Sequence, residues 1–372
     1  MSYFFRVPSF KSTLIIFLTI YVFLLILIYI FQRSLQYFPS GSADLPNGFE
    51  EVKLKTEDGI EVMVWQKIPE NYKKIIVYFH GNAGNIGDRT YRLETFSQKG
   101  YGVVALSYRG YFGSQGSPSQ NGLINDAKAV MRYLNSKNIA KNDLILFGES
   151  LGTGVVAQIG ANYLSDKTFK PLINLEVSSP QVDDDQDIQK NSKNLADNSL
   201  VNPDNSKPEN SQGNKLNQVS ENNASKSAEN NVTGSVASKS AGPIIVDKTS
   251  VDTTSAQIAT ESSADKSIDQ YFMIVLESPF FNIEELAKKT YPILPVKLML
   301  QDRYDSNLFV PNIKSPVLVF HGDKDRVVPI ESGRKLFLLI TARKKFVELR
   351  GSYHVDTNPD FLIEQIENFS GK

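Results

Sequence analysis

The sequence of 372 residues contains no cysteine. Disulfide bonds, thiolate metal sites and cysteine nucleophiles are therefore excluded, and the redox compartment stays undetermined. The sequence also has no large excess of positive or negative charge, because 40 basic and 41 acidic residues give a formal net charge of −1. The sequence shows no basic stripe of the kind that binds phosphate backbones, so nucleic acid is not an expected partner.

Histidine is scarce, with only His80, His321 and His354 in the chain. Three scattered histidines have no metal-ligand spacing, so we expect no bound metal. The segment 81–84 lacks the lysine and the following serine or threonine of a phosphate-binding loop, and no dinucleotide-binding glycine pattern opens a helix. We therefore expect no cofactor.

Aromatic residues are absent between Phe169 and Tyr271, although they make up 10% of the chain. Residues 181–269 consist mainly of Ser, Asn, Asp, Lys and Gln. Such a tract cannot bury enough apolar surface to offset the entropy lost on ordering, so we predict a polar disordered insertion at 181–269. It would divide a single folded domain into a first part at 45–178 and a second part at 271–372.

One long hydrophobic run is present at 14–31, where 18 residues carry no charge. At about 1.5 Å per residue, a helix of this length crosses a hydrocarbon core of about 30 Å. A cleaved signal peptide has a shorter apolar region and a small-residue cleavage site, so we predict an uncleaved, single-pass membrane anchor within 1–33. A buried core helix is the alternative, but the run has no polar face. Basic residues before the run and acidic residues after it favour a cytoplasmic N-terminus with the rest of the chain outside, although Arg33 weakens the asymmetry.

Short apolar strands alternate with amphipathic helices in the remaining sequence. A hairpin is expected at 51–66, followed by strands at 74–79, 102–107, 144–147, 273–276, 317–320 and 346–349, with helices between most of them. This alternation predicts an α/β fold, a mostly parallel sheet with helices on both faces. Ligands bind at the carboxyl ends of the strands in such a sheet.

The segment 280–316 follows the strand expected at 273–276 and so is expected to lie over that ligand-binding edge. It is rich in apolar and aromatic residues. As a cap segment it could cover a pocket for acyl groups, but the same residues also suit ordinary core packing, and the sequence leaves both interpretations open.

An apolar run at 144–147 leads directly into Gly-Glu-Ser-Leu-Gly at 148–152. This is the pattern G-x-S-x-G after a strand, in which two glycines permit a sharp turn into a helix and the serine is held out as a nucleophile. The alternative is a helix start that is merely capped by Ser150. A serine nucleophile also needs a base, an acid that orients the base, and donors for the oxyanion.

The order Ser, Asp, His along the chain supplies the first two of these groups. His354, in a loop after the last expected strand, is the expected base. Asp325 is preferred over Asp323 as the acid, and Glu277 remains a minor candidate.

The oxyanion donors are expected to be the backbone N–H of Leu151 and one N–H from the turn after His80, at Asn82 or else Ala83. His80 and His321 come immediately at strand ends. We expect these two histidines to shape backbone turns.

Seven stretches together resemble the α/β-hydrolase superfamily, and more narrowly its membrane-anchored branch of Bem-type, abhydrolase-domain serine hydrolases. They are Phe-His-Gly-Asn-Ala-Gly-Asn at 79–85, Tyr-Arg-Gly-Tyr at 108–111, Gly-Ser-Pro-Ser at 116–119, the motif at 148–152, Asp-Arg-Tyr-Asp-Ser at 302–306, His-Gly-Asp-Lys-Asp at 321–325 and the His354 loop. The resemblance covers nearly everything from residue 45 onward except the polar tract. It implies a catalytic triad of Ser150, Asp325 and His354, an anchor at 14–31, and ester or thioester hydrolysis.

The leading prediction is therefore a membrane-anchored serine hydrolase that cleaves carboxylic esters or thioesters, lipid or acyl-protein substrates among them, through an acyl-enzyme intermediate. Its expected partners are a small-molecule or lipid ester and the membrane. The alternatives are a serine peptidase of the same fold and a catalytically silent membrane scaffold. Because a fold does not determine a substrate, the sequence predicts the reaction class but not the substrate.

Overall fold

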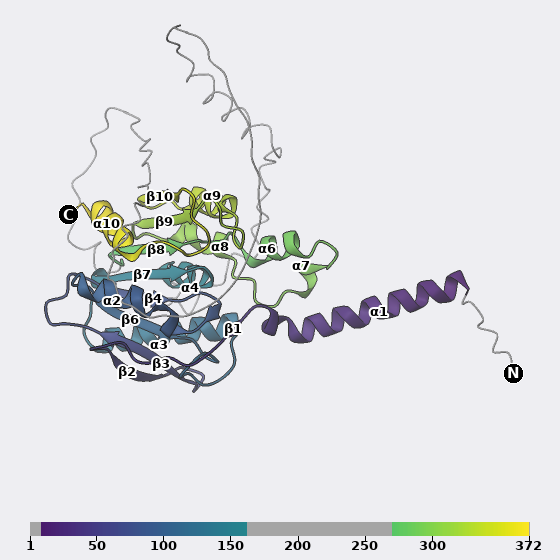
Figure 1. The fold of residues 1–372 in the computed structure, drawn as a ribbon, viewed down its shortest axis with the longest axis horizontal. Coiled ribbons are helices and arrows are strands. Elements are labelled where there is room, and N and C mark those ends of the chain that lie inside the picture. Colours follow the sequence, from purple (N-terminus) through teal and green to yellow (C-terminus); the bar gives the residue numbers. More distant parts are fainter. Residues whose placement is uncertain (1–8, 162–269, 372) are drawn as a thin grey trace, which may run out of the picture. The chain divides into compact units, whose positions relative to one another are not determined.

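The computed structural model describes residues 9–161 and 270–371, and all statements below concern these two stretches (Figure 1). The predicted insertion at 181–269 lies outside the described residues, as do the start of the predicted anchor region at 1–33 and the last residues of the predicted first part at 45–178.

The described residues form one sheet of eight strands in the order β10-β9-β8-β7-β4-β6-β3-β2. The strands are β2 (Glu50–Lys55), β3 (Glu61–Lys67), β4 (Ile75–Phe79), β6 (Gly102–Ser107), β7 (Leu144–Glu149), β8 (Met273–Glu277), β9 (Val317–Gly322) and β10 (Lys344–Leu349). Strand β3 pairs in antiparallel fashion with β2 and β6, and every other pairing in this sheet is parallel. The predicted hairpin and the mostly parallel sheet are confirmed.

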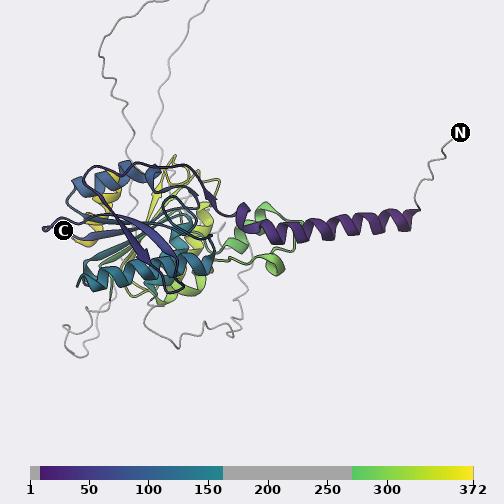
Figure 2. The same cartoon turned by 90° about the horizontal axis from the view of Figure 1, so that it is seen from below.

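Helices cover both faces of this sheet, as Figure 2 shows. Helices α2 (Thr90–Gln98) and α10 (Pro359–Ser370) pack on one face, and α3 (Gln120–Ser136), α4 (Leu151–Gly160) and α9 (Ile330–Leu339) pack on the other. Short 3₁₀ helices are η1 (Gln32–Leu35), η2 (Ile86–Arg89), η3 (Lys141–Asp143) and η4 (Val310–Asn312). Because both faces are covered, the central strands β4, β6, β7 and β8 are buried at every residue, which explains their continuous apolar runs.

The segment 280–316 contains α6 (Ile283–Thr290), α7 (Val296–Met299) and α8 (Ser306–Phe309). Its two ends pack into the core, where Phe280, Tyr304 and Phe309 are buried. Its middle differs, because Ile293 and Leu298 are exposed. The flanks of the segment therefore serve the core packing that the sequence left open.

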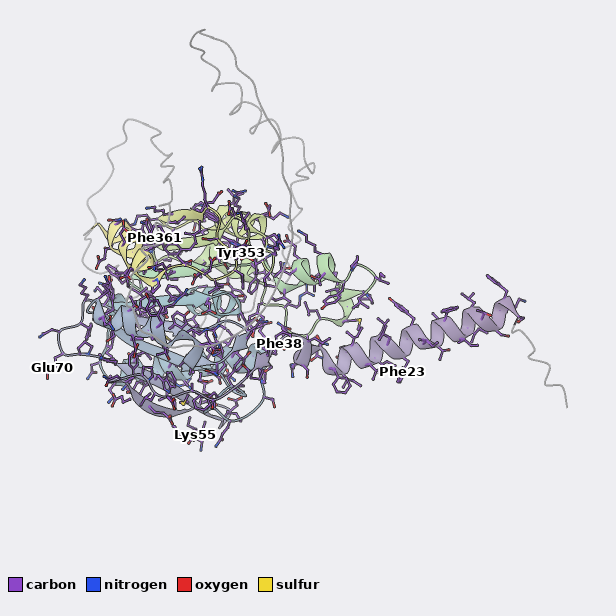
Figure 3. All side chains as sticks on the ribbon, viewed as in Figure 1. Phe23, Phe38, Lys55, Glu70, Tyr353 and Phe361 are labelled. Carbon is purple, nitrogen blue, oxygen red and sulfur yellow. The ribbon has the colours of Figure 1, made fainter. Side chains whose placement is uncertain are left out.

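Helix α1 (Phe10–Phe31) contains the apolar run at 14–31, and none of its residues is buried. Together with η1 it forms a helical stretch, Phe10–Leu35, that is long and apolar enough to cross a membrane, and its most apolar 18 residues have a mean hydropathy of 3.1. Figure 3 shows the side chains of α1, Phe23 among them, projecting from the helix.

A second, two-stranded sheet follows α1. Strand β1 (Phe38–Pro39) pairs in parallel with β5 (Ala83–Gly84). The sequence did not predict this pairing, because two residues carry no periodicity. It joins the residues that leave α1 to the turn after β4.

Candidate active site

Ser150 lies between the end of β7 and the start of α4, with φ 48° and ψ −112°. A non-glycine residue in this region is strained by about 1–3 kcal/mol, so the surrounding structure must hold it. The N–H of Ser150 donates to the carbonyl oxygen of Glu277 at 2.9 Å, and the carbonyl oxygen of Ser150 accepts from the N–H of Thr153 at 2.9 Å. These bonds fix the sharp strand-to-helix turn that the motif at 148–152 predicts.

The two glycines of the motif are needed because backbone occupies the space of any side chain. A Cβ on Gly152 would lie 2.0 Å from the carbonyl oxygen of Phe79, and a Cβ on Gly148 would lie 2.7 Å from the carbonyl oxygen of Gly152. Both contacts are shorter than real Cβ atoms show. The motif is therefore a packing requirement of the turn that presents Ser150.

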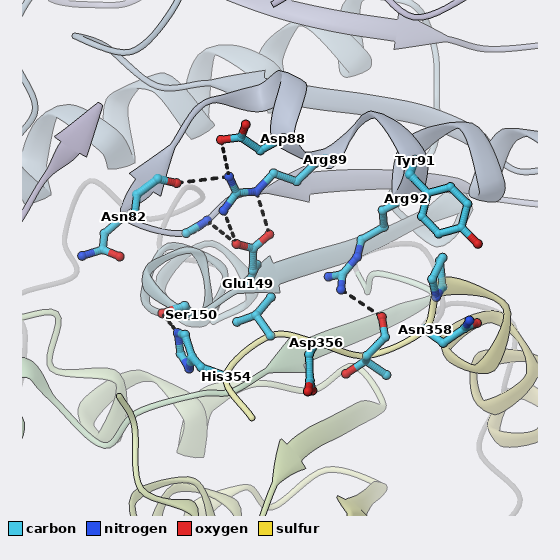
Figure 4. A pocket seen from close by; sticks show the side chains of 15 residues that line it. Asn82, Asp88, Arg89, Tyr91, Arg92, Glu149, Ser150, His354, Asp356 and Asn358 are labelled. Carbon is cyan, nitrogen blue, oxygen red and sulfur yellow. Dashed lines mark hydrogen bonds and ion pairs between the residues drawn. The ribbon is translucent and has the colours of Figure 1, made fainter. Parts of the chain in front are cut away.

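His354 lies between the serine and an acid. Its Nε2 is 2.9 Å from Oγ of Ser150 (Figure 4). Its Nδ1 is 2.7 Å from Oδ2 of Asp325. The loop of His354 approaches the end of β9 closely, since a Cβ on Gly322 would lie 2.4 Å from the carbonyl oxygen of Ser352. The structure thus brings together the three residues that the sequence assigns to a triad.

Asp325 is held in place by several donors. Its Oδ1 accepts from the N–H groups of Val327 and Val328 at 2.9 and 2.8 Å. Burial works to raise the pKa of this carboxyl group, but hydrogen bonds with His321 and His354 outweigh it and hold the pKa below the usual value. An ionised carboxylate at this position can orient the imidazole ring of His354 and stabilise its protonated form.

The competing acids contact other groups. Asp323 is exposed and accepts the N–H of Gly351 at 2.6 Å. Glu277 is buried and forms an ion pair with Arg92. Of these three carboxylates, Asp325 is the one that is hydrogen bonded to the ring of His354.

The turn after β4 borders the same site. The N–H of Gly81 donates to Glu149 at 3.3 Å, so it is already engaged, and the next N–H groups along the turn belong to Asn82 and Ala83. Leu151 begins α4, where the first N–H groups of a helix have no intrahelical acceptor. Their assignment as oxyanion donors stays a prediction.

The position of Asn82 is fixed by Tyr111, from the stretch at 108–111, and by two residues that follow α1. Its carbonyl oxygen accepts from the N–H of Phe38 at 2.9 Å and from the hydroxyl of Tyr111 at 2.7 Å. Its side-chain amide donates to the carbonyl oxygen of Gln36 at 3.0 Å. The segment that follows α1 therefore supports the turn beside Ser150.

His80 and His321 are both fully buried. Each ring contacts a nearby backbone carbonyl: Nδ1 of His80 lies 2.7 Å from the oxygen of Gly81, and Nε2 of His321 lies 2.8 Å from the oxygen of Val328. His321 also lies 3.5 Å from Asp325, so it supports the acid as well as its own turn.

Two buried carboxylates form ion pairs at the end of the sheet next to Ser150. Glu149 and Glu277 are register partners on β7 and β8, and they pair with Arg89 and Arg92, respectively. The hydroxyl of Tyr78 donates to Glu149 at 2.5 Å. Burial works to raise the pKa of Glu149, but the charge of Arg89 and its hydrogen bonds outweigh it and lower the pKa to about 2. Sequence reasoning missed these pairs.

A pocket of about 640 Å³ opens beside Ser150 (Figure 4). It is lined by residues of four segments: 81–83, 88–92, 149–150 and 354–359. None of these lining residues belongs to the segment 280–316. Because Asp88, Arg89, Arg92 and Asp356 are among them, the pocket offers polar contacts to a ligand held next to the serine.

Replacing Glu277 with alanine is expected to lower the free energy of unfolding by about 3–5 kcal/mol, because it leaves the guanidinium of Arg92, whose side chain is only 11% exposed, without its carboxylate. The matched variant Glu348→Ala breaks an ion pair with Arg334 whose side chains are 40% and 50% exposed, and it should cost less than about 1 kcal/mol. Urea unfolding in detergent, followed through the emission of Trp65, measures both, since Trp65 is buried and is the only tryptophan. Equal losses in the two variants would contradict a stabilising role for the pair of Glu277 with Arg92.

The stability of the protein is expected to fall between pH 6.5 and pH 4 because of His80. Burial, and then the charge of Arg89, lower the pKa of His80 from 6.5 to about 4. The unfolded chain therefore binds this proton more readily than the folded one, and lowering the pH through this window reduces the free energy of unfolding by up to about 3 kcal/mol. The same Trp65 assay at several pH values should show a flatter slope in His80→Phe, and an unchanged slope would refute the role of His80.

The family model described as the alpha/beta hydrolase fold matches residues 74–356. The protein bem46 of Schizosaccharomyces pombe is 34% identical over 150 residues, which cover 36% of this chain and 50% of that protein. The lysophosphatidylserine lipase ABHD12 of Danio rerio is 35% identical over 127 residues, covering 28% of this chain and 33% of that one. These matches thus span half or less of the length of either relative.

A solved structure, the Pyrococcus furiosus esterase Pf2001, aligns with 90% of this chain and 97% of its own, with a TM-score of 0.50 and 14% sequence identity. At this identity the likeness concerns the fold alone.

Proposed function

The chain belongs to the α/β-hydrolase fold family, and from that premise we propose that it is a membrane-anchored serine hydrolase that cleaves carboxylic esters or thioesters. The observation that carries the proposal is the continuous series of hydrogen bonds from Ser150 through His354 to Asp325. A catalytically silent scaffold has no need of these contacts or of the strained backbone at Ser150.

In the proposed reaction, Oγ of Ser150 attacks the acyl carbon of the substrate while Nε2 of His354 takes the hydroxyl proton. The carbonyl oxygen becomes an oxyanion, which accepts hydrogen bonds from the N–H groups of Leu151 and Asn82. Asp325 holds the ring orientation and stabilises the imidazolium ion. The intermediate collapses when the bond to the leaving alcohol or thiol breaks, and that group takes the proton from His354.

The acyl group then remains on Ser150 as an ester. A water molecule gives its proton to His354 and attacks the acyl carbon, and a second oxyanion forms at the same donors. Its collapse releases the carboxylic acid and returns the proton to Oγ. No cofactor enters either half of this reaction.

The substrate class follows from the pocket and from the anchor. A polar group of an ester fits the charged and polar lining near 88–92 and 354–359. Helix α1 would keep the enzyme at a bilayer, with the N-terminus inside and the catalytic domain outside. The relative named as a lysophosphatidylserine lipase supports a lipid ester as the substrate. An acyl-protein ester fits the same chemistry.

A substrate panel tests this reaction type. We expect the purified full chain to hydrolyse p-nitrophenyl esters of increasing acyl length and an acyl thioester much faster than the matching anilides, because the leaving group of an amide is poorer. Anilide turnover equal to or above that of the esters would overturn the assignment in favour of a peptidase. No turnover of any ester or thioester by the folded chain would overturn the hydrolase proposal itself.

A further inference from the structure

The residues 291–298, called the tip below, lie between the end of α6 and the end of α7 and expose large apolar side chains. Tyr291 is 51% exposed, Ile293 is 81% exposed and Leu298 is 85% exposed. Single apolar residues on a protein surface are ordinary, but three large ones within eight positions are typical of a surface that contacts a partner.

The tip is bonded to helix α1. The hydroxyl of Tyr21 donates to the carbonyl oxygen of Ile293 at 2.9 Å. Nearer to the end of the helix, the side-chain amide of Gln32 donates to the carbonyl oxygen of Met299 at 3.1 Å and accepts from the N–H of Gln301 at 2.9 Å. The segment therefore runs beside the carboxyl half of α1, as Figures 1 and 2 both show.

The next residues strengthen this attachment. Asp302 is buried and accepts from Nε of Arg33 at 2.9 Å and from the hydroxyl of Tyr37 at 3.1 Å. The hydroxyl groups of Tyr37 and Tyr304 are 3.0 Å apart. The base of the tip is thus fixed against the residues that leave α1, so the tip cannot move away from the helix without breaking a buried network.

The level of Tyr21 along α1 places the tip relative to a bilayer. Tyr21 precedes Phe31 by ten residues, which is about 15 Å of helix and about half of a 30 Å hydrocarbon core. At that level the hydroxyl of Tyr21 would have no water to bond, and the carbonyl of Ile293 supplies an acceptor. This bond satisfies both the hydroxyl of Tyr21 and the carbonyl of Ile293 where neither could bond to water.

We propose that the tip enters the lipid bilayer around the carboxyl half of α1 and forms a second membrane contact, with phospholipid as its partner. The inference rests on the proposed anchoring of α1. In this arrangement the exposed side chains of Ile293 and Leu298 lie in lipid, as do those of α1, in which no residue is buried by protein.

Charge supports lipid as the occupant. Lys288 and Lys289 precede the tip in the last turn of α6, and Lys297 lies within it. Lysine side chains beside an apolar insertion can extend to the phosphate level, where anionic headgroups attract them. Lys288 also pairs with Glu284 of its own helix at 2.5 Å, so the attraction to headgroups rests on Lys289 and Lys297, which a purely apolar protein partner would not favour around its contact.

The contact would also bring the site to its substrate. The tip belongs to the segment that follows β8, and the carboxyl end of β8 lies beside Ser150, whose N–H bonds to Glu277. A lipid ester leaving the bilayer at the tip would therefore meet the same edge of the sheet as the serine.

The absence of cysteine from the sequence makes a direct test possible. The full-length variant Leu298→Cys, labelled with an NBD fluorophore, is reconstituted in vesicles of phosphatidylcholine and phosphatidylserine that contain nitroxide-labelled acyl chains. We expect blue-shifted emission, strong quenching by the nitroxide lipid and little quenching by aqueous iodide. Phe23→Cys in α1 is the lipid-embedded reference. Leu338→Cys in α9, where the side chain is 75% exposed, is the aqueous reference.

The outcomes distinguish failure of the tip proposal from failure of the anchoring of α1. If lipid quenches the label at 23 while iodide quenches the label at 298, the tip proposal fails and the anchor stands. A label at 298 that is shielded from both quenchers is covered by protein, a second copy included, and this also overturns the proposal. If iodide reaches the label at 23, anchoring fails and the tip proposal fails with it. Fluorophosphonate labelling of each variant reports the hydrolase function independently of these results.

Discussion

Replacing Ser150 with alanine is expected to reduce turnover of a short p-nitrophenyl ester by a factor of about 10⁶ in kcat. The reason is that Oγ of Ser150 is the atom that forms the acyl-enzyme bond, and no other nucleophile is hydrogen bonded to His354 among the described residues. Initial rates at saturating substrate, measured with the purified full chain, give the effect directly.

The chain offers a matched control for this variant. Ser278 follows Glu277 at the end of β8 just as Ser150 follows Glu149 at the end of β7, and it too has a positive φ, of 51°. Its N–H donates to the carbonyl oxygen of Phe320, and it is buried away from the pocket lining. We expect Ser278→Ala to keep turnover within a few fold of the wild type. Equal losses in the two variants, with Trp65 emission unchanged, would refute the assignment of Ser150.

Replacing Asp325 with asparagine is expected to lower kcat by a factor of about 10⁴ with little change in KM. The carboxylate accepts a hydrogen bond from Nδ1 of His354 at 2.7 Å, whereas the amide group of asparagine can donate one there and stabilise the wrong tautomer. The substrate does not contact this residue in the proposed mechanism, so the loss should appear in kcat.

The neighbouring acid is the control for Asp325. Asp323 is exposed and accepts the N–H of Gly351, a bond that an asparagine oxygen can also accept. We expect Asp323→Asn to retain nearly full activity. A larger loss in Asp323→Asn than in Asp325→Asn would show that Asp325 is not the acid of the triad.

Those parts of the fold that depend on local pattern could be predicted from the sequence. Continuous apolar runs predict β4, β7 and β8, because strands covered on both faces have no polar side. The turn at Ser150 could be predicted because its two glycines are required by backbone contacts of less than 3 Å. The pairing of β1 with β5 could not, since it depends on where the chain leaves α1 and involves two residues on each side.

The candidate site shows the same division. The order of Ser150, Asp325 and His354 along the chain suffices to nominate them, and the sequence prefers Asp325 to Asp323, but only the structure shows which group each carboxylate contacts. The pairs of Arg89 with Glu149 and Arg92 with Glu277 join residues that are far apart in sequence. Partner choice of this kind depends on how α2 lies on the sheet, and no local pattern encodes it.

The lining of the pocket likewise depends on tertiary structure. The sequence placed 280–316 over the edge of the sheet and left open whether it covers a pocket or packs into the core. The pocket beside Ser150 is lined instead by 81–83, 88–92 and 354–359, which are loops and a helix start around the same edge. Position along the chain identified the edge but not the walls of the site.

The most direct measurement is the mapping of a fluorophosphonate adduct by mass spectrometry on the full chain in membranes. We expect one adduct on Ser150 in the wild type and none in Ser150→Ala, because only a serine activated by His354 and Asp325 should react with the probe. An adduct on a different residue, or no adduct in a wild-type chain whose Trp65 emission shows it folded, would contradict the claim that Ser150 is the nucleophile.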